Sequence, residues 1–298
     1  MIVVLLITIY LFLIPNISGF LDNENYLKSY ENIQTAETIA QSYTLFHKAT
    51  GANEPMYFLL QYSFSDFLSY EVFNGVINFV FLFILYLLVK KYFRKDLTAF
   101  IIILFFDYYM YRLTGELHRF KLAILFFMLF LYFQNTKYRF VSAVLSLSSH
   151  FQMLIIYPIF ILRNLKINRY IKINTLFYIL VAIIAIGIFS ALFSSSLIYK
   201  IQHYASLRFP TSSIIIAILY FLYLFINKDK RNIVNFTYLS LIIIPVASII
   251  GSDRLNIFLM EFIFFVELYK LLELNRKISA IVVLSIMFYN IFRMREFL

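Results

Sequence analysis

The chain contains no cysteine, which excludes disulfides, thiolate nucleophiles and cysteine-ligated metal sites. It also lacks the H-x-x-x-H pair of metal hydrolases, the G-x-S-x-G elbow of serine esterases, and the Walker A and G-x-G-x-x-G phosphate loops. A metal hydrolase, a serine esterase and a nucleotide-driven pump are therefore not expected. The sequence predicts an activity without metal or other cofactor, driven by its substrate or by a gradient.

Charged residues are scarce as well, at 14% of the chain, whereas they make up about a quarter of a soluble domain. Hydrophobic residues reach 62% and aromatic residues 20%. Because a membrane span needs about 20 apolar residues, a chain of 298 residues has room for roughly ten to eleven transmembrane segments with short connections. We predict an all-α polytopic integral membrane protein with a single integral domain, residues 1–298.

The formal net charge is +10, but the cations occur in short clusters between apolar runs. That pattern fixes the topology of membrane proteins. Membrane lipid is therefore an expected partner, and nucleic acid is not.

The first part of the chain alternates between apolar and water-compatible segments. Residues 1–20 predict a retained first span, because a basic n-region and a cleavage site are missing. Residues 21–53 are polar, with apolar side chains every three or four residues from Ile33 to Phe46, which predicts an amphipathic helix ending near Gly51. The Glu54-Pro55 pair predicts a further helix start, and the aromatic residues 56–70 suit the membrane interface without having to span it.

The apolar runs after this segment predict the remaining spans. They lie at residues 72–89, 97–113, 119–134, 173–192, 212–226, 233–250, 255–272 and 278–292. The run at 141–162 has a basic cluster on each side, and two half-helices turning near His150 leave more Lys and Arg on the cytoplasmic side than one span does. We therefore predict a hairpin at His150 and a cytoplasmic segment at residues 163–172.

This topology places several segments on one extracytoplasmic face together with His150. They are a large loop at residues 21–71, a second loop at 194–211, and the short turns at 114–118 and 251–253.

A cluster of charges lies on this face, where the positive-inside rule expects few cations. Arg112, His118, Arg119 and Lys121 fall between two apolar runs, with Glu116 as the single acid among them. One interpretation is that these cations snorkel at helix ends and that Arg112 pairs with Glu116 four residues on. The excess of positive charge favours an anionic partner.

Other polar residues in apolar surroundings leave two readings open. Arg254 opens a span on the same face and either binds an anion or pairs with Asp253 or Glu261. Asp107 and Glu261 are intramembrane carboxylates, which are either functional or paired with cations of neighbouring helices.

His150 is either a functional group or a packing histidine. If His150 is functional, the polar residues Ser148, Ser149 and Gln152 beside it would orient its ring.

The order of these marks resembles the EpsG-type and Wzy-type polymerases of bacterial surface polysaccharides. The resemblance rests on Glu54-Pro55 before an aromatic helix, on Arg119 followed by Leu122-Ala123 at the start of a span, and on Ser149-His150 at the end of the next segment. It covers residues 54–162, with Arg254 as a late match. It departs from the family pattern at Phe120, where a polar residue is common.

The resemblance implies a GT-C-like glycosyltransferase in the bacterial inner membrane. Such an enzyme transfers the growing glycan of an O-antigen, capsule or exopolysaccharide from undecaprenyl diphosphate to a hydroxyl of the incoming lipid-linked repeat unit, on the outer face. A chain-length regulator protein is a further expected partner. The predicted diphosphate ligands are Arg119, Arg254, Arg112, Lys121 and His118; the predicted catalytic residues are His150, Glu54 and Glu116, with His150 first as proton acceptor.

Two other classes of function remain as alternatives. A flippase for lipid-linked glycans would also place cations at the membrane boundary, but it usually has an internal repeat, and none is evident. A membrane acyltransferase that modifies the glycan would use His150 as a base toward an acyl donor.

Overall fold

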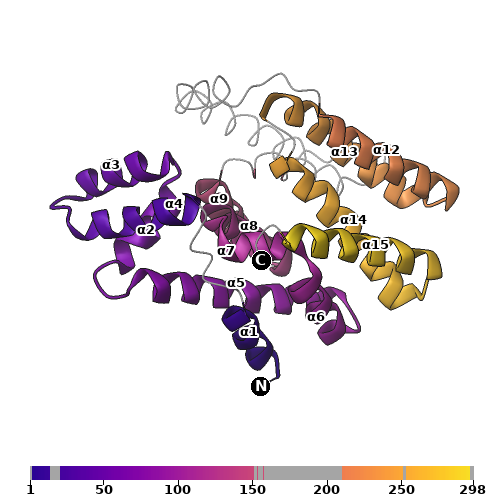
Figure 1. Ribbon diagram of the computed structural model, residues 1–298, viewed down its shortest axis with the longest axis horizontal. Helices are drawn as coiled ribbons and strands as arrows, with labels where there is room; N and C mark the ends of the chain where they lie inside the picture. The colour runs from indigo at the N-terminus through magenta and orange to yellow at the C-terminus, as the bar shows by residue number, and fades with distance from the viewer. Residues whose placement is uncertain are drawn as a thin grey trace. The chain divides into compact units, whose positions relative to one another are not determined.

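The computed structural model describes residues 2–13, 21–150, 153, 157, 210–250 and 253–295. Within these residues the chain forms thirteen helices and no strand, so the all-α prediction is confirmed. The chain divides into two compact units, one of Met1–Phe151 with Phe264–Leu298 and the other of Gln152–Ile263. Figure 1 shows the helices by label.

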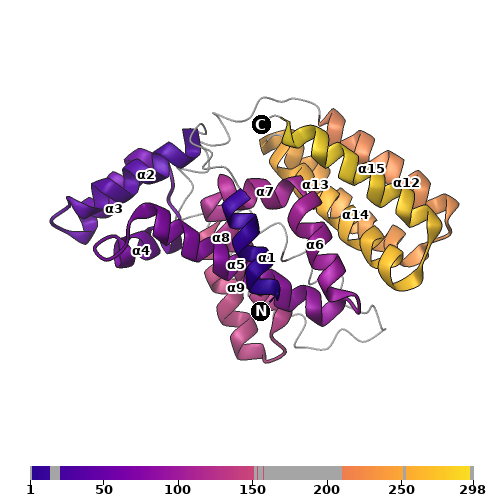
Figure 2. The same cartoon turned by 60° about the horizontal axis from the view of Figure 1, so that its bottom comes forward.

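The polar segment near the N-terminus folds into two helices, so the prediction of one amphipathic helix through Ile33 is wrong. After α1 (Ile2–Leu13), α2 (Leu21–Gln34) and α3 (Ile39–Thr50) lie side by side (Figure 2). The chain breaks between them because Thr38 caps α3 by accepting a hydrogen bond from the Gln41 amide, at 3.2 Å. The predicted end near Gly51 is confirmed: Gly51 caps α3 with φ +62°, a left-handed conformation that suits glycine.

The Glu54-Pro55 pair starts a helix, as predicted. In α4 (Pro55–Phe64), Pro55 occupies the first helical position, where its missing amide proton costs no hydrogen bond. The next helix, α5 (Tyr70–Tyr92), matches the predicted second span and ends in Lys90 and Lys91. Aromatic side chains of α2, α3, α4 and α5 meet in one core, which includes Tyr26, Phe46, Tyr57 and Phe73.

The predicted third span at residues 97–113 is not one continuous helix, because it breaks at Asp107. It forms α6 (Asp96–Phe106) and α7 (Tyr108–Gly115), bent by 69°. The Asp107 carboxylate accepts a hydrogen bond from the Tyr109 amide at 2.9 Å and so starts a new helix. Asn290 of α15 (Lys277–Met294) donates its side-chain amide to the Phe106 carbonyl at 3.0 Å, which satisfies a carbonyl group freed by the break.

Among the described helices, α5 and α15 are long and apolar enough to cross a membrane, and α6 with α7 would add a third crossing. The total of ten to eleven spans therefore stays a prediction. Other helices also lie at predicted span positions. They are α8 (His118–Tyr132), α12 (Thr211–Ile226), α13 (Lys230–Ile250) and α14 (Asp253–Leu274).

The helix before His150, α9 (Thr136–Ser149), stops where the hairpin was predicted to turn. His150 is its C-cap and has an extended backbone, with φ −161° and ψ 123°. The second half of the predicted hairpin, apart from Met153 and Tyr157, lies outside the described residues. So do the predicted cytoplasmic segment at 163–172, the span at 173–192 and residues 194–209 of the predicted loop at 194–211.

The second unit contains α12, α13 and the first turns of α14. α12 and α13 lie side by side in both views. The ring of Phe236 on α13 contacts Tyr220 of α12, with centroids 4.9 Å apart, and Phe262 of α14 at 5.7 Å. Ser213 donates a hydrogen bond to the Asn256 side chain at 2.5 Å, which joins α12 to α14.

Candidate functional site

Glu54 is held at the start of α4 with its side chain almost fully buried, at 1% exposure. Its Oε2 accepts a hydrogen bond from the Asn53 amide at 3.2 Å. A buried carboxylate is stable only when cations or donors compensate its charge. The two oxygens of Glu54 meet such groups from two other helices.

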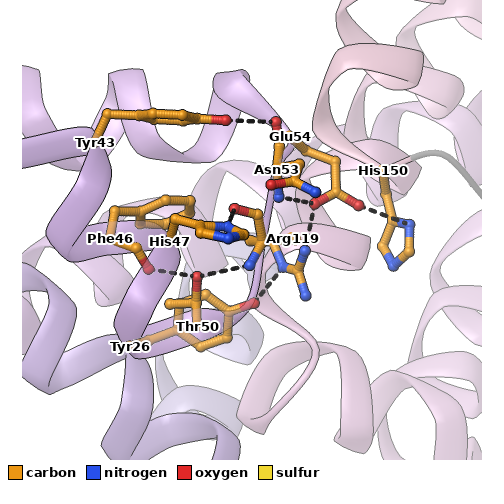
Figure 3. Close-up of polar contacts among 10 residues, drawn as sticks. Tyr26, Tyr43, Phe46, His47, Thr50, Asn53, Glu54, Arg119 and His150 are labelled. Atoms are coloured by element: carbon orange, nitrogen blue, oxygen red, sulfur yellow. Dashed lines mark hydrogen bonds and ion pairs between the residues drawn. The ribbon is translucent and has the colours of Figure 1, made fainter. Parts of the chain in front are cut away.

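Arg119, in the first turn of α8, supplies the cation. Its Nη1 donates to Oε2 of Glu54, and its Nε donates to the hydroxyl of Tyr26 on α2 (Figure 3). The guanidinium carbon also lies 6.0 Å from the centre of the Tyr26 ring. Among the described residues no hydrogen bond reaches Nη2, and the side chain keeps 16% exposure. Nε and Nη1 are therefore held by protein groups, and Nη2 can bind a ligand.

His150 lies near the other carboxylate oxygen of Glu54 than the one that Arg119 contacts (Figure 3). Its Nδ1 is 3.8 Å from Oε1 of Glu54, which is within ion-pair distance but longer than a hydrogen bond. The ring packs edge-on against Phe120, with centroids 5.4 Å apart. We define the Glu54 site as Tyr26, Glu54, Arg119 and His150.

The serines beside His150 have another role than the predicted one. Ser148 and Ser149 both donate to the Leu145 carbonyl, at 2.9 and 2.7 Å, because a serine in a helix can reach the carbonyl of the preceding turn. Gln152 lies outside the described residues. The His150 ring instead contacts Glu54, which comes from a distant part of the sequence.

The loop before Glu54 is fixed by hydrogen bonds from α3. The Tyr43 hydroxyl donates to the Asn53 carbonyl at 2.9 Å, and Thr50 Oγ1 accepts from the Ala52 amide at 3.2 Å (Figure 3). Burial and the negative charge of Glu54 raise the pKa of Tyr43, so its hydroxyl stays protonated as a donor. Helix α3 thus positions the carboxylate.

Lys121 and His118 belong to a different polar cluster than Arg119. Lys121 is fully buried and donates to Asn78 Oδ1 at 2.5 Å and to Asn74 Oδ1 at 3.1 Å, both on α5. His118 contacts Asn74 Oδ1 at 3.1 Å and the Tyr70 hydroxyl at 3.3 Å. The two side chains share a face of α8 because they are three residues apart. They hold α8 against α5. Lys121 is not brought to the ion pair with Glu54, whereas the His118 ring packs edge-on against Tyr26 of the Glu54 site, with centroids 5.1 Å apart.

Arg112 and Glu116 pair with each other, as one of the two interpretations of the sequence had it. The Nη2 and Nε of Arg112 donate to Oε2 of Glu116 at 2.8 and 3.0 Å, four residues apart on the last turn of α7. Arg293 of α15 lies 5.3 Å from the centre of the Tyr108 ring, near the same turn. None of these side chains joins the Glu54 site through a hydrogen bond or ion pair.

Arg254 lies in the first turn of α14, in the second unit, and its side chain is outside the described residues.

Sequence reasoning missed Tyr26. It is one of several tyrosines in a polar segment, and only its contact with Arg119 sets it apart. Sequence reasoning also missed the buried ion pair of Glu267 and Lys270, which lie 2.7 Å apart. Ser279 donates a hydrogen bond to the Glu267 carboxylate. Among the described residues there is no group of three or more His, Asp or Glu that could hold a metal.

Comparison with known proteins gives one match. The model of the EpsG family matches residues 1–298, which is the whole chain. No curated protein and no solved structure matches. The residues on which the resemblance rested, Glu54, Arg119 and His150, are those that the fold brings together. The chain belongs to the EpsG family.

Proposed function

We propose that this protein polymerises lipid-linked oligosaccharide repeat units of a bacterial surface polysaccharide. The growing glycan leaves undecaprenyl diphosphate and joins a hydroxyl of the incoming unit, on the outer face of the inner membrane, in a GT-C-like fold. The observation that carries the proposal is that Arg119, Glu54 and His150 come together from three separate segments of the chain. Membership of the EpsG family supports it.

Arg119 fits the diphosphate of the leaving lipid. A guanidinium donates its N–H groups to phosphate oxygens, and Nη2 is the nitrogen of Arg119 that the described residues leave open. Tyr26 and Glu54 hold the other two nitrogens, so Nη2 keeps one direction. A donor that is already oriented toward developing negative charge stabilises the transition state most effectively.

His150 fits the role of proton acceptor. The bond between the anomeric carbon and the diphosphate oxygen breaks and leaves its electron pair on the diphosphate, while the acceptor hydroxyl oxygen bonds to that carbon. The hydroxyl proton passes to Nε2 of His150, since Nδ1 faces Glu54. The Glu54 carboxylate then stabilises the imidazolium. The Arg119 guanidinium and the His150 imidazolium, the two positive groups that the reaction needs, therefore share the buried Glu54 carboxylate.

The test is a reconstituted assay with purified protein and a purified lipid-linked repeat unit. Wild-type protein is expected to release undecaprenyl diphosphate and to build a ladder of glycans, and Arg119→Ala and His150→Ala should not. In cells, deletion should leave single repeat units on the carrier or lipid core. Loss of all surface glycan would instead indicate export, and a normal ladder lacking acyl groups would indicate an acyltransferase; either result would refute the proposal.

A further inference from the structure

Helix α4 and the turn that follows it expose a cluster of apolar side chains. Leu59 is 43% exposed, Tyr62 39%, Phe64 43% and Phe67 81%. We call these four residues the α4 patch. The helix contains no charged residue, and its face opposite Leu59 and Tyr62, which includes Tyr57 and Gln61, is buried. A helix with one face in a core and an apolar face outside needs a second apolar environment.

The position of the α4 patch is fixed by hydrogen bonds from α2. Gln34 donates its side-chain amide to the Ser65 carbonyl at 2.6 Å, and the Tyr30 hydroxyl donates to the Leu68 carbonyl at 2.9 Å. The Phe64 ring also packs against Phe73 of α5, with centroids 6.2 Å apart. The patch is thus a built surface that α2 and α5 hold in place.

The candidate span that follows indicates that lipid covers the α4 patch. α5 begins at Tyr70, only three residues after Phe67, so the two residues lie within about 10 Å of each other. Val72 and Val76 of α5 are 50% and 52% exposed, as expected of side chains that face lipid. The exposed apolar surface of the turn is therefore continuous along the chain with that of a candidate span.

We propose that α4 is an interfacial anchor. It lies on the outer face of the inner membrane, with the α4 patch inserted at the boundary between headgroups and acyl chains. Phe and Tyr side chains favour this depth, where apolar rings are buried and the tyrosine hydroxyl stays hydrated. α4 itself carries no charge that insertion would desolvate, and the exposed Asp66 in the turn beside Phe67 would stay among the headgroups. A second protein is the alternative occupant, and the experiment below separates the two.

The anchor has a consequence for the Glu54 site, and this part rests on the proposed function. Glu54 caps the N-terminus of α4, so a helix lying in the interface holds Glu54 and its partner Arg119 near headgroup depth. That is the depth at which the diphosphate of a lipid carrier lies. The anchor would thus set the height of the site relative to its substrate.

The chain has no tryptophan, so a single introduced indole reports its own surroundings. The variants are Leu59→Trp and Phe67→Trp, with Tyr62→Trp as a further reporter if one of them does not fold. The matched control is Thr44→Trp, at an exposed position of α3. Each full-length variant is reconstituted in vesicles of phosphatidylethanolamine and phosphatidylglycerol, with bromine on the acyl chains near the headgroup.

Bromine should quench the indoles at 59 and 67 roughly two-fold, since an interfacial helix buries its apolar face about 5–10 Å into this boundary. The control at 44 should keep its full emission. Unquenched but blue-shifted emission at 59 would show that protein covers the patch and would overturn the proposal, as would equal quenching at 44. Quenching does not depend on catalysis, so an inactive but quenched protein would refute the polymerase and leave the anchor standing.

Discussion

Replacing Arg119 by lysine separates the charge of this side chain from its hydrogen-bonding geometry. A lysine keeps the positive charge beside Glu54, but its single nitrogen cannot also hold the Tyr26 hydroxyl in the position of Nε or present two parallel donors to a phosphate. Arg119→Lys should therefore fail nearly as badly as Arg119→Ala.

The structure gives the size of this effect. A hydrogen bond to a charged group contributes about 1.5–3 kcal/mol, and the variant loses one to Tyr26 and one to the phosphate, or about 3–6 kcal/mol in all. Because each 1.36 kcal/mol corresponds to a tenfold change in rate, kcat/KM should fall by about 10²- to 10⁴-fold.

The assay is the release of undecaprenyl diphosphate from purified lipid-linked repeat unit, with wild type, Arg119→Lys and Arg119→Ala at equal amounts of folded protein. Lys95, at an exposed N-terminal boundary of α6, offers a control charge position: Lys95→Gln should leave the rate unchanged. Full polymer length with Arg119→Lys would show that Arg119 supplies only charge or topology, and the argument from its geometry would then fail.

Three further predictions address neighbouring groups. Tyr26→Phe should lower kcat/KM by about 10- to 100-fold, because it loses the hydrogen bond to Arg119. The control Tyr43→Phe loses only a neutral hydrogen bond to the Asn53 carbonyl and should lower kcat/KM much less. Equal effects would argue against a specific role of Tyr26. His150→Gln should abolish at least about 99% of the maximal rate and spare substrate affinity; lost affinity with a surviving rate would make His150 a phosphate ligand and Glu54 the base to replace next. Lys121→Met leaves Asn74 and Asn78 without their buried donor, so it should lower the free energy of unfolding by about 1–3 kcal/mol, measured by thermal unfolding. The activity per folded molecule should stay intact. Lost activity at full stability would instead place Lys121 in the substrate site.

The sequence alone was sufficient for the features that depend on local chemistry or composition. The excess of apolar residues predicted an all-helical membrane protein, and the Glu54-Pro55 pair predicted the start of α4, because proline fixes its own backbone angle and needs no donor there. The end of α3 at Gly51 and the extent of α5 followed in the same way. Each of these depends on neighbouring residues in the chain.

Only the tertiary structure decided which of the cations share a site. Arg119 and Lys121 are two residues apart and equally basic in the sequence, but on a helix they point about 200° apart. Arg119 therefore reaches Glu54 and Tyr26, whereas Lys121 reaches the asparagines of α5. The role of Tyr26 likewise depends on Arg119, far away in the chain. The break at Asp107 combines a local cap with a hydrogen bond from the distant Asn290, which only packing brings to the Phe106 carbonyl.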